Sequence, residues 1–209
     1  MKLLLTGFEP FNESKINPSE QVVRALEKRL TDIELFPVIL PVDRLRAPQV
    51  LVECLESIHP DAVICLGEAP RRMRISIERV AINLQDYSIP DNAGNLVSDE
   101  PVVPGGPAAY FVTLPVKKIL QAVLETGIPA ELSLTAGSYL CNQVTYILLH
   151  TLAQQTNHIP AGFIHLPYLH EQAAVIAQAG KGAVPSMGLE TMLIAIETAI
   201  KVLQIDSLN

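Results

Sequence analysis

Residues 130–155 read AELSLTAGSYLCNQVTYILLHTLAQQ, and this stretch carries the pattern that predicts the fold. The short apolar run over 130–135 predicts a buried strand, and Ala136-Gly137-Ser138 forms a tight turn after it. Apolar residues then recur at helical spacing and predict a helix over 139–155: Val144, Ile147, Leu148 and Leu152. A strand that passes through a tight turn into a helix is the repeating unit of an α/β protein.

The same alternation continues on both sides of this stretch. Further apolar runs predict strands, with a break in the fourth near Glu78: 2–6, 33–40, 61–66, 74–84 and 162–166. Asn17 as cap and Pro18 at the first helical position mark the start of a helix. Apolar spacing predicts the other helices: 43–58, 114–126 and 189–203. A long loop is expected over 85–108, which is rich in Pro and Gly, and a looser Gly/Ala segment after residue 166.

Strands that alternate with helices imply an α/β fold with a largely parallel, twisted sheet covered on both faces. The chain has 209 residues, of which 49% are hydrophobic and 18% charged, enough apolar material for one sizeable core. No repeat or linker divides the sequence. We therefore expect a single domain over residues 1–209.

The charge of the chain argues against nucleic acid as a partner. The net charge is −7 and the 15 Lys and Arg residues are scattered, so no basic stripe is expected. The apolar run at the N-terminus is interrupted by Gly7 and Glu9, which makes it too short for a signal peptide, and no run approaches the length of a membrane span. We expect a soluble, cytoplasmic protein with no membrane partner.

The three cysteines are Cys54, Cys65 and Cys141, an odd number without CxxC spacing. This predicts free thiols in a reducing compartment, and no zinc site or other metal. Cys54 and Cys65 lie in apolar segments and are interpreted as small buried hydrophobes. Cys141 falls in the first turn of a helix, where the positive helix end should lower the pKa of the thiol and favour a reactive thiolate. Position alone leaves a structural role for Cys141 equally open.

Ligands of open α/β sheets bind beyond the carboxyl ends of the strands. Those ends are expected at Gly7-Phe8, Gly67-Glu68, Ala136-Gly137 and His165. The turn at Ala136-Gly137 leads directly to Cys141. The sequence therefore places a thiol and an imidazole near one edge of the sheet.

A nucleophilic thiol needs a base, and a base needs a group that orients it. His165 is the first choice as base and His170 the weaker one, although a histidine in an apolar segment is more often a satisfied core residue. Glu78 is the candidate orienting group, because it stands in an otherwise apolar stretch where an unpaired carboxylate would be costly. A salt bridge from Glu78 to Arg74 or Arg79 would explain the same residue equally well.

Four motifs follow one another along nearly the whole chain: GFEPF at 7–11 with NPS at 17–19, ERVAIN at 78–83 with IPDN at 89–92, TAGSYLCN at 135–142, and GFIHLP at 162–167. At these motifs the sequence resembles pyroglutamyl peptidase type I, also called pyrrolidone carboxyl peptidase. Each motif alone is modest evidence, but together, in order and at similar spacing, they are highly specific.

The resemblance implies a homotetramer with a three-layer α/β/α sandwich and a triad of Cys141, His165 and Glu78. It also implies a pocket for a lactam ring: Phe8, Phe11, Ile89, Tyr139 and Leu140, with Asn17 as a polar member. The implied thiol-peptidase activity is hydrolysis of the bond after an N-terminal pyroglutamyl (5-oxoprolyl) residue of peptides, through a thioester on Cys141 and without a cofactor. An uncharged ring is best recognised by apolar walls with a few hydrogen bonds.

The sequence departs from the family at two places. Ser88 stands where the family commonly has an arginine associated with the oxyanion, and Glu68-Ala69-Pro70-Arg71 replaces a Gln- or Leu-Ala-Gly-Gly turn. Loss of an oxyanion donor can lower a rate by about a hundredfold or more. Two functions other than peptidase activity therefore remain open: a pyroglutamyl-peptide-binding protein with weak or no turnover, and a cysteine amidase with another substrate.

Overall fold

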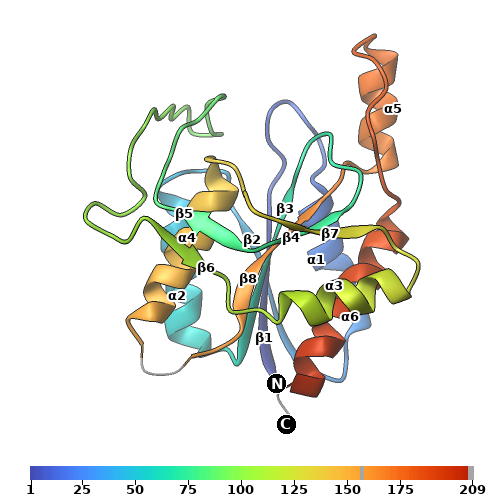
Figure 1. The fold of residues 1–209 in the computed structure, drawn as a ribbon. Coiled ribbons are helices and arrows are strands. Elements are labelled where there is room, and N and C mark those ends of the chain that lie inside the picture. Colours follow the sequence, from blue (N-terminus) through green and yellow to red (C-terminus); the bar gives the residue numbers. More distant parts are fainter. Residues whose placement is uncertain (156–157, 207–209) are drawn as a thin grey trace.

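A computed structural model of the chain describes residues 1–155 and 158–206, and within them a six-stranded sheet forms the centre (Figure 1). From one edge to the other, the strands are β2 (Glu34–Leu40), β1 (Lys2–Phe8), β3 (Ala62–Glu68), β8 (Ala161–Leu166), β4 (Ile75–Glu78) and β7 (Ala130–Ser133). The central strands β3 and β8 are buried at every position, which agrees with their continuous apolar sequences.

Strand direction confirms a mostly parallel sheet, with one correction. β2, β1, β3 and β8 are parallel, whereas β4 pairs antiparallel with β8 and parallel with β7. β4 and β7 therefore run opposite to the other four strands, and the expectation that the strand before Cys141 ends at the common carboxyl edge is wrong. Residues 134–139 bring the chain to that edge instead, since Gly137 and Tyr139 reach the cavity described below. Strand direction follows from long-range pairing, which apolar periodicity does not encode.

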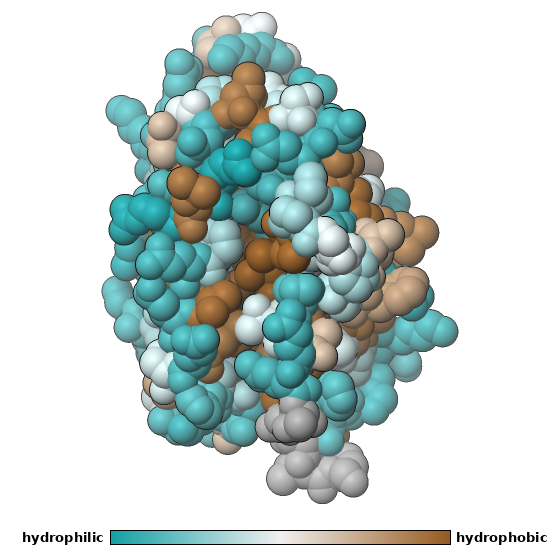
Figure 2. Space-filling model, turned by 90° about the vertical axis from the view of Figure 1, so that its left-hand side faces the viewer, coloured by the Kyte–Doolittle hydropathy of each residue, from teal (hydrophilic) through white to brown (hydrophobic). Residues whose placement is uncertain are grey.

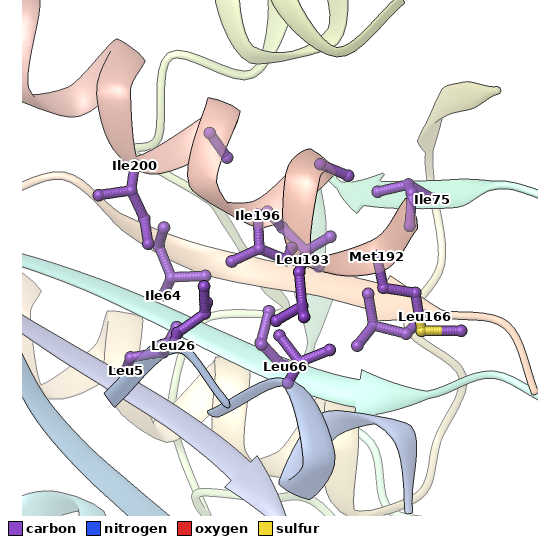
Figure 3. Close-up of a cluster of buried hydrophobic side chains, with 14 of the residues drawn as sticks. Leu5, Leu26, Ile64, Leu66, Ile75, Leu166, Met192, Leu193, Ile196 and Ile200 are labelled. Atoms are coloured by element: carbon purple, nitrogen blue, oxygen red, sulfur yellow. The ribbon is translucent and has the colours of Figure 1, made fainter. Parts of the chain in front are cut away.

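Helices cover both faces of the sheet, which confirms the α/β/α layers (Figure 1). One face carries α1 (Pro18–Arg29), α3 (Val116–Glu125) and α6 (Leu189–Asp206), and the other carries α2 (Arg46–Ile58) and α4 (Leu140–Ala153). Figure 3 shows the first of these interfaces, where side chains of α6 meet those of the strands: Met192, Leu193, Ile196 and Ile200 with Ile64, Leu66 and Leu166. Burying such a side chain fully stabilises the fold by about 1.5–3 kcal/mol.

The expected helix starts at Asn17 and Asp43 are explained by capping. The Asn17 side chain accepts a hydrogen bond from the backbone N–H of Ser19, and Pro18 occupies the first turn, as predicted. The helix predicted from residue 43 begins three residues later, at Arg46. Asp43 Oδ1 accepts hydrogen bonds from the backbone N–H groups of Leu45 and Arg46 at this helix start. The other predicted elements differ from the observed ones by a few residues at their ends.

Two elements were not expected from the sequence. The predicted strand 74–84 breaks at Arg79, and its second half forms β5 (Val80–Ile82), which pairs antiparallel with the unexpected β6 (Ala109–Phe111) in a separate small sheet. The segment after β8 contains α5 (His170–Gln178), which projects from the body of the molecule (Figure 1). Gln172 is its only buried residue, so α5 buries no apolar face.

The surface on the side that lies at the left of Figure 1 is mostly hydrophilic, and its apolar side chains form separate patches (Figure 2). The exposed large apolar side chains of the described residues include Leu45, Leu96 and Phe111. Among the helices that the structure describes, none combines the length and the apolar character needed to cross a bilayer.

The first turn of α4 anchors the long loop that follows β5. Asn142 is buried, its Oδ1 accepts a hydrogen bond from the backbone N–H of Ile82 at 2.9 Å, and its Nδ2 donates to the carbonyls of Ile82 and Leu84, each at 2.9 Å. Gln143 donates to the carbonyl of Arg44. Its Oε1 accepts from the hydroxyl of Tyr87 in the loop 85–108, so the first turn of α4 fixes both the start of this loop and one residue within it.

We expect Asn142→Leu, which keeps the side-chain size, to lower the free energy of unfolding by about 1–3 kcal/mol, because it leaves partly buried backbone groups of Ile82 and Leu84 without their partner. Urea unfolding measures this change. The matched control is Gln178→Leu, since Gln178 is exposed at the end of α5. Equal losses in the two variants would contradict the anchoring role.

Candidate active site

A cavity of about 320 Å³ lies where β1, β3 and β8 end and α4 begins. Its lining combines apolar side chains with a thiol, an imidazole, a carboxyl and a guanidinium: Phe8, Phe11, Asn17, Val42, Glu68, Ala69, Pro70, Arg72, Ser88, Ile89, Ala136, Gly137, Tyr139, Leu140, Cys141 and His165. All the residues that the sequence assigned to the ring pocket are in this lining, together with Cys141 and His165. Glu78 is not in the lining and lies behind His165.

Cys141 is the second residue of α4 and is partly exposed. The N-cap residue Tyr139 makes no side-chain hydrogen bond to the helix, in contrast to Asn17 at the start of α1. The first backbone N–H groups of a helix have no partner within the helix. The start of α4 therefore presents a reactive side chain beside N–H groups that can receive a negative oxygen.

The thiol of Cys141 lies directly over Gly67, the next-to-last residue of β3. A Cβ atom built on Gly67 would come within 2.9 Å of Cys141 Sγ and 2.6 Å of Phe163 Cζ. Gly67 is also paired with His165 on the neighbouring strand. The absence of a side chain at residue 67 is therefore what allows the thiol to approach the strand that carries the imidazole.

His165 is 3% exposed, and its Nδ1 lies 2.7 Å from Glu78 Oε1. The ring of Phe163 packs against the imidazole with 4.7 Å between centroids, which limits its rotation. A carboxylate at Nδ1 selects the tautomer that carries its proton there. The Nε2 lone pair of His165 then remains available as a base.

Arg72 is the cation that pairs with Glu78. Its Nη1 donates to Glu78 Oε1 at 2.7 Å, and its Nη2 donates to the carbonyl of Thr135 at 2.8 Å. The alternative prediction, a salt bridge from Glu78 to Arg74 or Arg79, is wrong about which arginine is the partner. Arg74 pairs with Glu131 instead. Glu78 takes part in both contacts at once, so the salt bridge and the contact with His165 do not exclude each other.

The charge states of the pair follow from burial. Burial lowers the pKa of His165 below its ordinary value, although the Glu78 carboxylate opposes this, so the imidazole is neutral near pH 7. Burial first, and then the carboxylates of Glu78 and Glu68, raise the pKa of the Cys141 thiol, while Arg72 acts in the opposite direction. The prediction that the pKa of Cys141 is lowered is therefore wrong, because removal from water raises it. At rest, a neutral thiol stands beside a neutral base.

The apolar wall of the cavity is aromatic. The ring of Tyr139 packs edge-on against Tyr87 with 4.6 Å between centroids. The centroid of the Phe11 ring lies 6.2 Å from that of Tyr139. Phe8 is buried, and its backbone N–H donates to the hydroxyl of Ser19. Such a wall suits a small ring better than a charged group.

Asn17 holds this wall in place. Its Oδ1 accepts from the backbone N–H and the hydroxyl of Ser19, and its Nδ2 donates to the carbonyl of Glu9 at 3.1 Å. Most of its hydrogen-bonding capacity is thus used to connect the first loop to α1. Glu9 in turn accepts from the backbone of Val42 and the side chain of Asn92, which binds the IPDN loop to the same wall.

The remaining candidates of the sequence lie elsewhere. Cys65 is buried in β3, and burial raises its pKa to about 12, as fits a small core hydrophobe. Cys54 is partly buried on α2, outside the cavity. His170 starts α5 and its Nδ1 contacts the hydroxyl of Ser186 instead of Cys141. Among the described residues, no cluster of His, Cys, Asp and Glu side chains has the arrangement of a metal site.

Gly67 and Val42 were not predicted as site residues, and Arg72 was not predicted as the partner of Glu78. A glycine at the end of a buried strand often marks a close approach, and this signal could have identified Gly67. Arg72 stands in the run Arg71-Arg72-Met73-Arg74, where the sequence does not indicate which arginine turns inward.

Comparison with known proteins gives one consistent result. A family model described as pyroglutamyl peptidase matches residues 1–205. A pyrrolidone-carboxylate peptidase of Pyrococcus furiosus is 48% identical over 207 residues, covering 96% of this chain and 99% of that protein. One of Yersinia pestis is 44% identical, covering 98% and 94%. The crystal structure of pyrrolidone carboxyl peptidase from Pyrococcus furiosus superposes with a TM-score of 0.94 at 46% identity, covering 99% of each chain.

Gly67→Ala is expected to destabilise the fold by about 1–3 kcal/mol, because the added methyl group must displace Phe163 or the thiol. It should also change the rate at which iodoacetamide alkylates Cys141. Urea unfolding and peptide mapping after partial alkylation measure the two effects. Gly188→Ala is the matched control, since a Cβ there meets its nearest atom at 3.4 Å. Parent-like stability of Gly67→Ala would contradict the steric constraint.

Proposed function

This chain belongs to the pyroglutamyl peptidase family, and we propose that it hydrolyses the peptide bond after an N-terminal pyroglutamyl residue with Cys141 as nucleophile, His165 as general base and acid, and Glu78 as the group that orients His165. The observation that carries the assignment of roles is the 2.7 Å contact between His165 Nδ1 and Glu78 Oε1, next to the cavity that holds the thiol. It leaves Nε2 of His165 free for proton transfer.

The reaction is an acyl transfer in two stages. Cys141 Sγ attacks the pyroglutamyl carbonyl carbon as its proton passes to His165 Nε2, and the imidazolium then protonates the leaving amine as the C–N bond breaks. A thioester remains on Cys141. Water, deprotonated by His165, attacks the thioester and releases pyroglutamate with the thiol restored. The Glu78 carboxylate stabilises the imidazolium in both stages.

The oxyanion is assigned to the start of α4. The backbone N–H of Cys141 stands in the uncapped first turn, where it has no partner within the helix. Ser88, which replaces an arginine of the family pattern, lines the cavity. Arg72 also lines it, but both of its Nη atoms are engaged by Glu78 and Thr135. Backbone N–H donors therefore carry more of the oxyanion stabilisation in this chain than in a chain with the family arginine at this position.

The ring pocket is assigned to the aromatic wall. Phe8, Phe11 and Tyr139 supply apolar faces for a lactam ring, and Ile89 and Leu140 complete the lining. A cavity of about 320 Å³ is at the small end of ligand pockets, which favours a single five-membered ring over a larger side chain. A prolyl group would bring a charged ring nitrogen into this apolar wall and should be rejected.

Hydrolysis is favoured over binding without turnover, because the family match spans residues 1–205 and the nucleophile, base and orienting residues are all in reach of one cavity. A shifted amidase specificity has no supporting observation. Peptides with an N-terminal pyroglutamate are therefore the proposed substrates.

We also propose a cytoplasmic homotetramer in which residues 1–209 form one domain. The free thiols support a reducing compartment. Exposed apolar side chains such as Phe111 and Leu134 support self-association. Strand β1 lies between β2 and β3, and α6 packs on α1, so the two ends of the chain share one core.

Cys141→Ser is expected to lower the release of aminomethylcoumarin from pyroglutamyl-aminomethylcoumarin by about 10³-fold or more, because a hydroxyl is far less nucleophilic here. The fluorescence assay measures it, with Cys54→Ser as the matched control that keeps parent-like activity. Prolyl-aminomethylcoumarin should not be cleaved. Turnover that survives Cys141→Ser would overturn the mechanism, and a folded parent protein that binds pyroglutamyl peptides without cleaving them would favour the binder.

Alkylation by iodoacetamide is expected to inactivate the protein through Cys141 before Cys54 or Cys65 react. The base beside Cys141 can take up its proton, whereas Cys65 is fully buried. Peptide mapping at half-inactivation gives the order. Loss of activity that tracks modification of Cys54 would contradict the assignment.

A further inference from the structure

Glu68 places a second carboxyl in the cavity wall, at the last position of β3. It is 8% exposed, and its Oε2 accepts a hydrogen bond from Gln172 Nε2 at 2.6 Å. No hydrogen bond to its Oε1 occurs in the part of the chain that the structure describes. One oxygen of this buried carboxyl is thus held by Gln172, and the side chain lines the same cavity as Cys141.

Gln172 fixes the carboxyl in this orientation. Its Oε1 accepts from the backbone N–H of Leu169, and its Nε2 also lies 3.3 Å from both Ser14 Oγ and the carbonyl of Ile16. The amide therefore joins the start of the projecting helix α5 to the first loop and to Glu68. Because Leu169 and the segment with Ser14 and Ile16 also bind the amide, Gln172 is held in place for its contact with Glu68.

The charged and titratable groups around Glu68 come from several elements. Cys141 lies on α4, Tyr168 follows β8, and Arg71 and Arg72 follow β3, with His165 and Glu78 beyond the thiol. Arg72 is already paired with Glu78. When Glu68 is ionised, the carboxylates of Glu68 and Glu78 both disfavour a thiolate at Cys141. The guanidinium of Arg72 favours it, but Arg72 is also paired with Glu78.

The carboxyl of Glu68 changes its charge near neutral pH. Burial raises its pKa to about 7, and the hydrogen bond from Gln172 opposes this increase. The Glu68 carboxylate is in turn one of the causes that raise the pKa of Cys141. Glu68 is therefore mainly neutral below pH 7 and mainly ionised above it, and only the ionised form opposes a thiolate.

We propose that Glu68 is a positioning residue that acts through Cys141, whose readiness to lose a proton depends on the charge of Glu68, and that Gln172 of α5 sets the point at which this charge appears. The proposal rests on the proposed function, in which Cys141 is the nucleophile. It assigns a role to a side chain that departs from the family pattern, and it connects the base of α5 to the chemistry of the cavity.

The rate of Cys141 alkylation by iodoacetamide between pH 5 and pH 9 tests the proposal, with the site of reaction read by peptide mapping. The parent rate should show an inflection near pH 7 in addition to the rise that any thiol gives. Glu68→Gln should remove this inflection and react roughly three- to tenfold faster above pH 7, which corresponds to half to one pKa unit of the thiol, while matching the parent below pH 6. Glu125→Gln on α3 is the control and should keep the parent profile.

Gln172→Ala provides a second arm that leaves Glu68 in place. Because the lost hydrogen bond favours the ionised carboxyl, the inflection should move to higher pH. Parent-like profiles of a folded Glu68→Gln, or an unmoved inflection in Gln172→Ala, would overturn the proposal. Alkylation needs no turnover, so a protein that fails to cleave pyroglutamyl-aminomethylcoumarin but shows the Glu68-dependent profile would refute only the proposed function.

Discussion

A single carboxylate oxygen holds the candidate active site together. Oε1 of Glu78 receives both His165 Nδ1 and Arg72 Nη1, each at 2.7 Å, and Oε2 of the same side chain is buried without a hydrogen-bond partner in the described structure. A buried carboxylate is stable only when such charged or polar donors surround it. Through Arg72 the same oxygen is linked to Thr135, in the segment that leads to Cys141. The antiparallel β4, which carries Glu78, thus connects His165, the proposed base, to the segment that leads to Cys141, the proposed nucleophile.

Much of the candidate site could be predicted from local sequence. Cys141 stands at the start of a run with helical apolar spacing, and His165 stands at the end of an apolar run, so each is marked by a change of pattern. Phe8 and Tyr139 came from the resemblance and lie in the cavity lining. The raised pKa of Cys141 could not be predicted, because it depends on burial by residues distant in sequence. For the same reason the sequence named the wrong arginine for Glu78.

The fold could be predicted as far as its periodicity extends. Buried strands and amphipathic helices were located within a few residues, because burial imposes their apolar spacing. The direction of β4 and β7 was missed, since it is decided by pairing with β8 and β4 over long distances in the chain. The helix α5 was missed because it is held by a few polar contacts of Gln172 and His170 instead of an apolar face.

The uncapped start of α4 has a thermodynamic consequence. Where a side chain such as Asn17 would normally satisfy the first N–H groups, Tyr139 leaves them without a side-chain acceptor, and a missing cap costs a helix about 1 kcal/mol. A molecule whose carbonyl oxygen occupies that position supplies the missing acceptor and binds only the folded chain. Occupancy of the cavity therefore shifts the folding equilibrium toward the folded state. The free energy of unfolding is larger with substrate bound than without it.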